Sequence, residues 1–231
     1  MLMGPQNLPE NIRLVQERIK LSAAESQRNV DSVTLLAVTK SQPAEVVRAG
    51  AVAGLSEFGE SYVQEALGKI EALQDLPLTW HFIGNIQANK TRDIAENFAW
   101  VHGIDRLRIA ERLSEQRPYH AAALNVCLQV NLAAEASKGG ALPKDIPELA
   151  ARVALLPRLR LRGLMCIPPA EEDIAAQRRW FAELAHLLWK LNENGAELDT
   201  LSMGMSADLE AAILEGATIV RVGTALFGAR T

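Results

Sequence analysis

A lysine that follows an apolar run is the residue best placed for chemistry. Lys40 comes directly after residues 33–39 (VTLLAVT), and with the two-residue period of a strand it shares a face with Leu36 and Val38. On an inward face the amine would lie in a partly desolvated cavity, where burial favours the neutral form that attacks a carbonyl. Lys40 is therefore a candidate Schiff-base lysine. The alternative is a lysine that reaches from a strand end into solvent.

Two loops near the C-terminus have the composition of an anion site. In the first, Gly204 relaxes the backbone and Ser206 stands where a helix N-cap belongs. In the second, Gly223 allows a close approach of the main chain, and Thr224 offers a hydroxyl and an N–H at a helix start, where an anion is favoured. Together the loops predict phosphate binding. The alternative is a pair of ordinary turn glycines with a capping serine.

These residues must be positioned by an alternation of strands and helices. A helix is expected over residues 7–28, where apolar residues recur every three or four positions. Eight apolar runs then predict strands, at residues 33–39, 55–58, 78–83, 99–103, 124–131, 159–166, 198–203 and 218–222. Helical patterns lie between them, at residues 43–53, 62–73, 88–96, 106–116, 145–155, 172–192 and 207–214. Such alternation is typical of parallel strands.

Eight parallel strands can form an open sheet or a closed barrel. Neither GxGxxG after the first strand nor GxxxxGK[ST] occurs, so the nucleotide motifs of open sheets are missing. The 231 residues fit a (β/α)₈ barrel, which takes roughly 250 residues as one domain. We predict an α/β fold, a single (β/α)₈ TIM barrel with an extra N-terminal helix, over residues 1–231. Its active site would lie where strands end and βα loops begin.

Composition excludes several classes of protein. Lys and Arg number 24 against 28 Asp and Glu, and this formal charge of −4 gives no general attraction to nucleic acid or acidic lipid. The chain start lacks a basic segment followed by an apolar one, and no run of about 18 apolar residues occurs. Cys127 and Cys166 stand far apart in apolar stretches, as reduced core thiols do. We expect a cytoplasmic protein that binds neither nucleic acid nor membrane.

Other polar residues give weaker signals. His81 and His102 end the third and fourth predicted strands and Asp105 follows, but no HxH or HExxH spacing supports a metal, and hydrogen-bonded structural histidines are the expectation. Glu135 and Lys138 lie in a charged loop that is either a lid or solvated surface. The residues thus favour a ligand that carries both an aldehyde and a phosphate. Pyridoxal phosphate is one such ligand, and a phosphosugar aldolase with Lys40 attacking its substrate is the competing interpretation.

Six motifs in order resemble the pyridoxal phosphate homeostasis protein family over nearly the whole chain. They are VTK (38–40), FGESYVQE (58–65), WHFIG (80–84) with Gln87, Asn89 and Lys90, RGLM (162–165), LSMGMSAD (201–208) and RVGTALFG (221–228). The resemblance implies a barrel like the N-terminal domain of alanine racemase and pyridoxal 5'-phosphate (PLP) as cofactor, bound through Lys40. It also implies that Ser206, Gly223 and Thr224 hold the phosphate and that Arg221 faces the pyridine nitrogen. Ser61 departs from the family, which usually has Asn there, and is left out of the predicted site.

The resemblance implies a cofactor carrier or buffer for intracellular PLP homeostasis rather than an enzyme. An arginine at the pyridine nitrogen disfavours its protonation and weakens the ring as an electron sink. The racemase's opposing tyrosine comes from a second domain, which we expect this chain to lack, and neither Tyr62 nor Tyr119 is an evident substitute. The alternative is a PLP-dependent amino-acid racemase or lyase. PLP-dependent apoenzymes are candidate partners, monomer is the default state, and Lys90 or Lys138 is the competing position for the imine.

Overall fold

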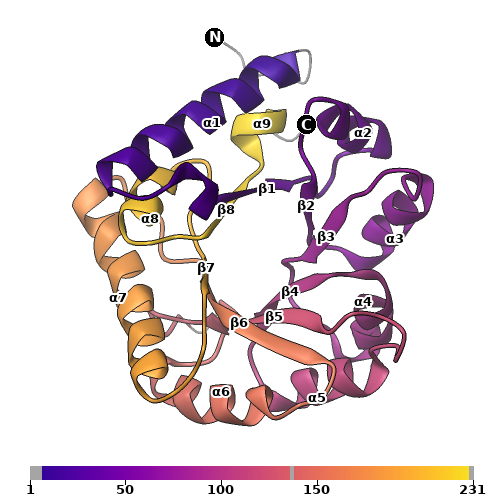
Figure 1. Cartoon of the computed structure of the whole chain (residues 1–231), viewed down its shortest axis with the longest axis vertical. Helices are drawn as coiled ribbons and strands as arrows, with labels where there is room; N and C mark the ends of the chain where they lie inside the picture. The colour runs from indigo at the N-terminus through magenta and orange to yellow at the C-terminus, as the bar shows by residue number, and fades with distance from the viewer. Residues whose placement is uncertain (1–6, 136–137, 229–231) are drawn as a thin grey trace.

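The computed structural model describes residues 7–135 and 138–228, and its centre is a closed barrel of parallel strands. Each strand pairs with its neighbours in chain order, and β8 pairs with β1 to close the ring (Figure 1). The eight strands are β1 (Thr34–Val38), β2 (Glu57–Glu60), β3 (Thr79–Phe82), β4 (Trp100–Ile104), β5 (Leu124–Val130), β6 (Leu159–Cys166), β7 (Thr200–Ser202) and β8 (Ile219–Val222).

Helices surround the barrel on its outside (Figure 1). They are α1 (Leu8–Glu25), α2 (Ala44–Val52), α3 (Val63–Ala72), α4 (Thr91–Asn97), α5 (Leu107–Gln116), α6 (Ile146–Ala154), α7 (Ile174–Glu193), α8 (Leu209–Leu214) and α9 (Thr224–Phe227). Three short 3₁₀ turns join them to the strands, η2 (Val30–Ser32), η3 (Ala88–Lys90) and η4 (Pro143–Asp145). Among the described residues no helix is both long and apolar enough to cross a bilayer.

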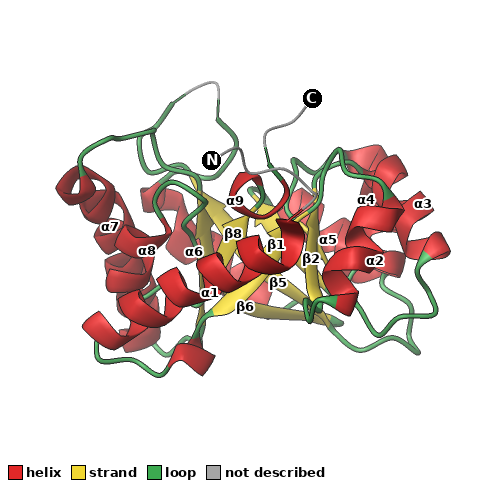
Figure 2. Cartoon of the chain, turned by 90° about the horizontal axis from the view of Figure 1, so that it is seen from above, coloured by secondary structure: helices red, strands yellow, loops and turns green. Residues whose placement is uncertain are grey.

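The first helix lies outside the repeating βα units and packs against the end of the chain. Its buried side chains include Leu8, Ile12, Val15 and Ile19, spaced three or four residues apart, so α1 has one apolar face. That face covers α8 and α9, and Asn11 Nδ2 donates a hydrogen bond of 2.8 Å to the Leu226 carbonyl in α9 (Figures 1 and 2). The N-terminal helix therefore fastens the C-terminal one to the barrel.

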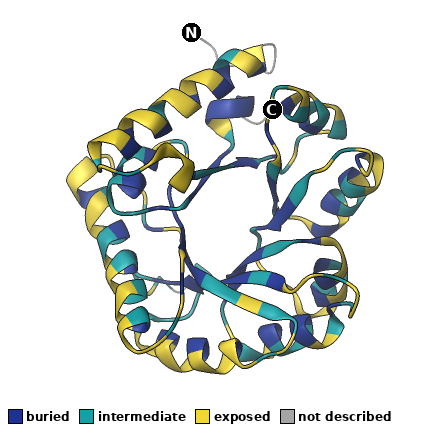
Figure 3. Cartoon of the chain, in the orientation of Figure 1, coloured by how far each residue is buried: buried dark blue, intermediate teal, exposed yellow. Residues whose placement is uncertain are grey.

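Burial follows the layers of the fold. The strands are mostly buried, whereas most of the surrounding helices are buried on the face turned toward them and exposed on the other; the short α9 is buried at three of its four residues (Figure 3). Every residue of β8 is buried, and β5 is buried at all but its second position. Strands covered on both faces read as continuous apolar runs, and this explains why the sequence pattern located them.

The predicted barrel, the extra helix and the order of the elements are confirmed, but several details differ. The N-cap residue of α8 is Asp208 and not the predicted Ser206, because the helix begins only at Leu209. The second strand was expected at residues 55–58 but is formed by Glu57–Glu60. The prediction stopped too early because the strand ends in the buried side chain of Glu60, and no hydropathy pattern indicates a buried carboxylate. The short helix Thr224–Phe227 begins at the helix start predicted at Thr224, but none of the predicted helix ranges included it. Four residues are too few to show a helical period.

Gly163 marks the closest approach of two strands. A Cβ at this position would overlap the carbonyl oxygen of Thr200, which belongs to the neighbouring strand β7 and pairs with Gly163 in register. The glycine of the RGLM motif is therefore required by backbone packing rather than by a turn.

Replacing Gly163 with alanine should destabilise the protein. Relief of the overlap needs a backbone shift, and overpacking of this kind costs about 1–3 kcal/mol in the free energy of unfolding, to be measured by urea denaturation. The control is Gly68→Ala in α3, where an added Cβ meets nothing within 4 Å and alanine favours the helix. An equal loss of stability in both variants would contradict the explanation.

Candidate functional site

The five predicted site residues line one cavity at the C-terminal end of the strands. This cavity has a volume of about 280 Å³, and its lining includes Lys40, Ser206, Arg221, Gly223 and Thr224. They come from the end of β1, the loop after β7, the strand β8 and the start of α9. Residues almost the length of the chain apart thus meet at one place, because β8 lies beside β1 in the closed barrel.

A second hollow adjoins the first at Lys40. It has a volume of about 560 Å³, and four residues line both hollows, namely Lys40, Ser61, Ile83 and Ile167. Its polar lining includes Tyr62, Asn85, Gln87, Lys90 and Gln129. Ser61, which departs from the family pattern, therefore lies beside Lys40, and the WHFIG motif contributes a wall of the site.

The main chain on both sides of Lys40 is held by α3. Lys69 Nζ donates a hydrogen bond of 2.7 Å to the Thr39 carbonyl, and the Ser41 N–H donates one of 2.6 Å to Glu65 Oε1. Ser41 has a φ of 64°, in the left-handed region that a residue with a side chain seldom adopts. The bond from Ser41 to Glu65 stabilises this strained turn, so the half-buried Lys40 projects from a fixed backbone.

Lys69 is itself buried, and its positive charge lies between two carboxylates. Its ammonium contacts the Glu60 carboxylate at 2.7 Å and also the Glu65 carboxylate, and Thr39 Oγ1 donates to Glu60 Oε1 at 2.6 Å. Burial raises the pKa of Glu60, and the hydrogen bonds from Lys69 and Thr39 partly offset this rise. The FGESYVQE motif therefore supplies acids that position Lys40.

The two C-terminal loops are bonded to each other and to α1. Ser206 Oγ accepts a hydrogen bond of 3.2 Å from the Ala225 N–H, which joins the loop after β7 to the first turn of α9. Arg18 in α1 donates a bond of 2.9 Å to the Ser206 carbonyl. At Gly223 a Cβ would lie 3.3 Å from the Val38 carbonyl oxygen, closer than most real contacts. The main chain at Gly223 thus runs close to β1, as the sequence indicated.

Arg221 lies at the floor of the cavity and is almost fully buried. Its Nη1 donates to the carbonyl of Ser202 at 2.6 Å and to Ser202 Oγ at 2.9 Å, and its Nη2 donates to the Cys166 carbonyl at 2.8 Å. Burial lowers the pKa of Arg221, while the neighbouring thiols and Asp208 act against this change. A guanidinium with three fixed acceptors presents a donor, and not a proton acceptor, to any ligand above it.

The histidines do not lie at strand ends as expected. His81 and His102 point into the barrel, where His81 Nδ1 and His102 Nε2 are 2.9 Å apart, and Asp105 instead pairs with Arg106. Hydrogen bonding between the histidines agrees with the structural interpretation. Within residues 7–135 and 138–228 no group of three or more His, Cys, Asp or Glu side chains could hold a metal ion.

The remaining candidate residues do not line the site. The two cysteines are buried in the core of the protein, and the others lie outside the cavity. Cys127 and Cys166 are free and buried, and burial raises the pKa of each thiol to about 12, so both are unreactive at neutral pH. Lys138 pairs with Glu135 at 2.8 Å. Tyr119 is exposed on the surface beneath Arg158, which lies 4.5 Å from its ring centre.

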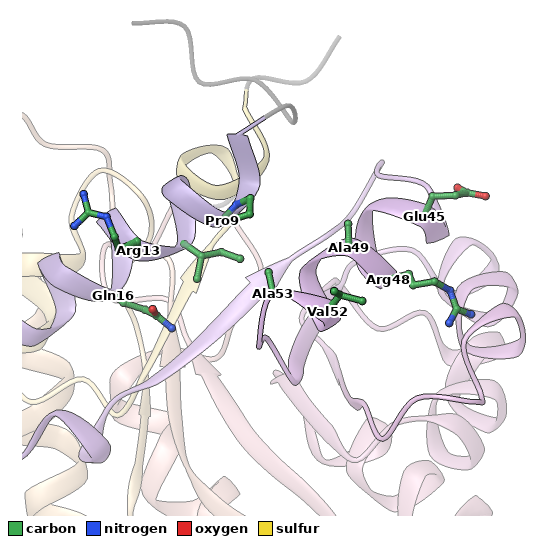
Figure 4. A pocket seen from close by; sticks show the side chains of 9 residues that line it. Pro9, Arg13, Gln16, Glu45, Arg48, Ala49, Val52 and Ala53 are labelled. Atoms are coloured by element: carbon green, nitrogen blue, oxygen red, sulfur yellow. The ribbon is translucent and has the colours of Figure 1, made fainter.

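A larger hollow on the outside of the barrel contains none of the predicted site residues. It lies between α1 and α2 and has a volume of about 620 Å³ (Figure 4). Its lining includes Pro9, Ile12, Val52 and Ala53, and its two arginines are already paired, Arg13 with Glu10 and Arg48 with Asp75. The chemistry-bearing residues converge at the barrel mouth instead.

Several residues of the site were missed by sequence reasoning. Ile83, Ile167, Met205 and Phe227 line the cavity but were assigned no role, because they are apolar, although all but Ile167 lie within the quoted motifs. Lys69 stands four residues after Glu65, a spacing that usually indicates an exposed ion pair on a helix. Only the fold shows that this pair lies inside the protein.

Comparison with known proteins places the chain among related sequences and folds. The family model for the alanine racemase N-terminal domain matches residues 6–231. A curated relative from Pseudomonas aeruginosa, named pyridoxal phosphate homeostasis protein, is 60% identical over 223 residues, which are 96% of each chain. PipY from Synechococcus elongatus, solved with PLP bound, is 39% identical with a TM-score of 0.81, covering 93% of this chain and 100% of PipY. Alanine racemase from Corynebacterium glutamicum shares the fold, with a TM-score of 0.72 at 16% identity, covering 99% of this chain and 63% of the racemase.

Replacing Lys69 with methionine should destabilise the protein by about 3–5 kcal/mol, because the buried Glu60 carboxylate loses its partner. Without Lys69 the pKa of Glu60 rises further above its unfolded value, so the folded state holds its proton more tightly than the unfolded state. The free energy of unfolding should then fall as pH rises from the ordinary glutamate pKa of 4.5 upward. Urea denaturation between pH 4 and 8 measures this.

The matched control is Arg48→Met, which breaks the exposed pair with Asp75. Exposed pairs contribute about 0–1 kcal/mol, so this variant should unfold almost as the wild type does. A pH-independent loss in Lys69→Met, or an equal loss in both variants, would count against the buried charge as the cause.

Proposed function

The chain belongs to the alanine racemase N-terminal domain family and, within it, to the pyridoxal phosphate homeostasis proteins, and we propose that it holds PLP reversibly through Lys40 as an intracellular carrier or buffer. The observation that carries this proposal is the convergence of Lys40, Arg221 and the two C-terminal loops on one cavity. A ligand that fits it has an aldehyde at one end, a phosphate at another and a ring between.

The residues present suit such a ligand. When bound, PLP offers an aldehyde that a lysine amine attacks with loss of water, forming a carbon–nitrogen double bond. Lys40 stands on a rigid backbone between the two hollows, so its amine is directed while its side chain remains within reach of solvent. That position suits reversible attachment, because release requires water to reach the link.

The phosphate belongs at the loops of Ser206, Gly223 and Thr224. Gly223 brings the backbone close, and Thr224 offers a hydroxyl at the start of α9. The Ser206 hydroxyl accepts a bond from the Ala225 N–H, so its own proton is available for a phosphate oxygen. Arg18 holds the Ser206 main chain from outside the cavity, which keeps this loop in place before a ligand arrives.

Arg221 favours holding over catalysis. Its guanidinium donates hydrogen bonds and cannot accept a proton, so a pyridine nitrogen beside it stays unprotonated. An unprotonated ring withdraws electrons weakly from the reacting carbon, and carbanion chemistry on the bound cofactor is correspondingly slow. We therefore assign no efficient catalytic activity to the protein.

A second candidate function is a PLP-dependent racemase or lyase. The family match to alanine racemase favours it, as does Tyr62, which lines the hollow that Lys40 also lines. The two functions differ in solvent deuterium exchange at the α-carbon of amino acids. A carrier shows none above the rate of free PLP, and exchange at ordinary enzymatic rates would overturn the non-catalytic assignment.

We further propose that the protein works in the cytoplasm as a monomer and that PLP-dependent apoenzymes are its recipients. The two reduced, buried thiols suit a reducing compartment. Light scattering after gel filtration measures the oligomeric state. Transfer to an apoenzyme in the presence of a scavenger for free PLP measures direct delivery.

Wild-type protein incubated with PLP should be yellow, and Lys40→Ala should lose the visible band of the covalent link. Borohydride reduction followed by peptide mapping should place the label on Lys40 rather than on Lys90 or Lys138. Lys20→Ala, which removes an exposed lysine of α1, is the control and should keep the band. A colourless wild type that cannot be reconstituted would refute PLP binding, and a sugar phosphate trapped on Lys40 would favour the aldolase.

Thr224→Val together with Ser206→Ala should weaken binding of PLP much more than binding of pyridoxal, which lacks the phosphate. Loss of two hydrogen bonds to a charged group costs about 3 kcal/mol, or roughly a hundredfold in Kd. Titration of both ligands by absorbance measures the difference. An equal loss for both ligands would indicate general damage to the cavity rather than loss of phosphate contacts.

A further inference from the structure

Beneath the cavity, a continuous series of polar side chains crosses the barrel interior. Arg221 Nη1 lies 2.9 Å from Ser202 Oγ, which lies 2.8 Å from His102 Nδ1. His102 Nε2 lies 2.9 Å from His81 Nδ1, and His81 Nε2 lies 2.6 Å from Glu57 Oε2. The step from His102 to Ser202 joins β4 to β7, which are not neighbours in the sheet, so the series spans the barrel.

The two ends of the series differ in chemistry and in exposure. Arg221 lines the cavity and can only donate hydrogen bonds. Glu57 is the first residue of β2, at the N-terminal end of the strands, and its side chain is 29% exposed. An ionised carboxylate can only accept hydrogen bonds. The series therefore has a hydrogen-bond donor at one end and an acceptor at the other, and the groups between them can both donate and accept.

These ends determine where each proton lies. Burial lowers the pKa of His102 well below its usual value, and also lowers that of His81 although Glu57 opposes this, so both rings are neutral near pH 7. Neutral His81 must then place its one proton on Nε2, toward Glu57, and accept at Nδ1. His102 accordingly donates from Nε2 and accepts at Nδ1, and the Ser202 hydroxyl donates to His102.

The opposite direction is excluded for neutral rings. It would set the lone pair of His81 Nε2 against the Glu57 carboxylate at 2.6 Å, and only an additional proton could relieve this repulsion. The direction of the series therefore follows from Glu57, although Glu57 touches neither Ser202 nor Arg221.

We propose that Glu57, His81, His102 and Ser202 form a directional relay that positions Arg221. The relay commits the Ser202 hydroxyl proton to His102, so a lone pair of Ser202 Oγ faces the guanidinium. In the opposite direction His102 Nδ1 would donate to Ser202 Oγ, so that one oxygen would accept from both His102 and Arg221, and the hydroxyl proton would lose His102 as its acceptor. The bond from Arg221 to Ser202 Oγ would then compete with a second donor at the same oxygen, and Arg221 would be held less firmly.

The consequence for the ligand rests on the function proposed above. A guanidinium held at three points presents the same N–H to the pyridine nitrogen at each encounter, whereas a looser one must be ordered on binding. Glu57, His81 and His102 are therefore positioning residues, since they act on the cofactor site only through Ser202 and Arg221.

The first test uses the protein without PLP. The chain has four histidines, and the other two, His120 and His186, are exposed, so long-range proton–nitrogen spectra of histidine-labelled protein resolve all four rings. At pH 7.5 both His81 and His102 should be protonated at Nε2 alone. Glu57→Gln, whose amide oxygen still accepts, should retain these tautomers, whereas Glu57→Leu should abolish the fixed tautomer of His81. A wild type with Nδ1 protonated in either ring would overturn the relay.

The second test uses PLP. Glu57→Leu and Ser202→Ala should each raise the Kd for PLP about tenfold and shift the visible band, whereas Glu57→Gln should remain within about twofold of wild type. The control is Glu71→Leu, which replaces an exposed glutamate of α3 and should change neither quantity. Circular dichroism verifies that the variants fold. Glu57→Leu and Ser202→Ala disrupt the relay at opposite ends, so the same effect in both variants is expected if the relay is the cause.

The tests separate this proposal from the function on which it rests. Wild type that fails to bind PLP would refute the function, and the tautomers would still decide the relay. Correct tautomers with an unchanged Kd and visible band in both Glu57→Leu and Ser202→Ala would overturn the positioning role.

Discussion

The buried ammonium of Lys69 is the interaction on which the site depends. It joins three elements at once, because it contacts the Thr39 carbonyl at the end of β1, Glu60 in β2 and Glu65 in α3. A single charge in a medium of low polarity is costly to bury and must be surrounded by acceptors. The protein meets this need with the groups that also fix the main chain around Lys40. The backbone geometry around Lys40 is thus a consequence of neutralising the buried charge of Lys69.

A second set of buried polar residues holds Arg221, as the first set holds the main chain around Lys40. Arg221 is held by β6 and β7 through the Cys166 and Ser202 carbonyls, and Ser202 is oriented from within the barrel. Arg221 is therefore supported by neighbouring strands, whereas Lys69 is held by β2, by the residue after β1 and by Glu65 of its own helix. Polar groups buried this fully are stable only when almost all their hydrogen bonds are made, so each set has one geometry. A cavity with such walls is preorganised for a ligand.

The architecture could be predicted from sequence because it follows from patterns that local residues carry. Strands covered on both faces, such as β5, read as apolar runs, and α1 shows a clear helical period. Lys40 was found because it directly follows such a run. The family resemblance supplied Arg221, whose role no local pattern indicates. The barrel then brings Lys40 and Arg221 to one cavity, while the roles of individual residues there remain predictions.

What the sequence could not show was partnership at a distance. Glu60 and Lys69 look like ordinary charged residues until the fold buries both, and His81 and His102 were placed at strand ends although they face the barrel interior. Hydropathy assigns each residue a preference by itself. Burial of each polar residue in a network is unfavourable when the residue is considered alone, and only its hydrogen bonds to the other members offset this cost.

The hydrogen bond from Asn11 to Leu226 joins residues 215 positions apart, and the pairing of β1 with β8 has a similar span. During synthesis Lys40 leaves the ribosome long before Gly223 and Thr224 do. The growing chain therefore carries Lys40 long before it has the cavity that Lys40 lines. Because contacts of such span form late and slowly, the cavity is complete only when α1 and α9 have met.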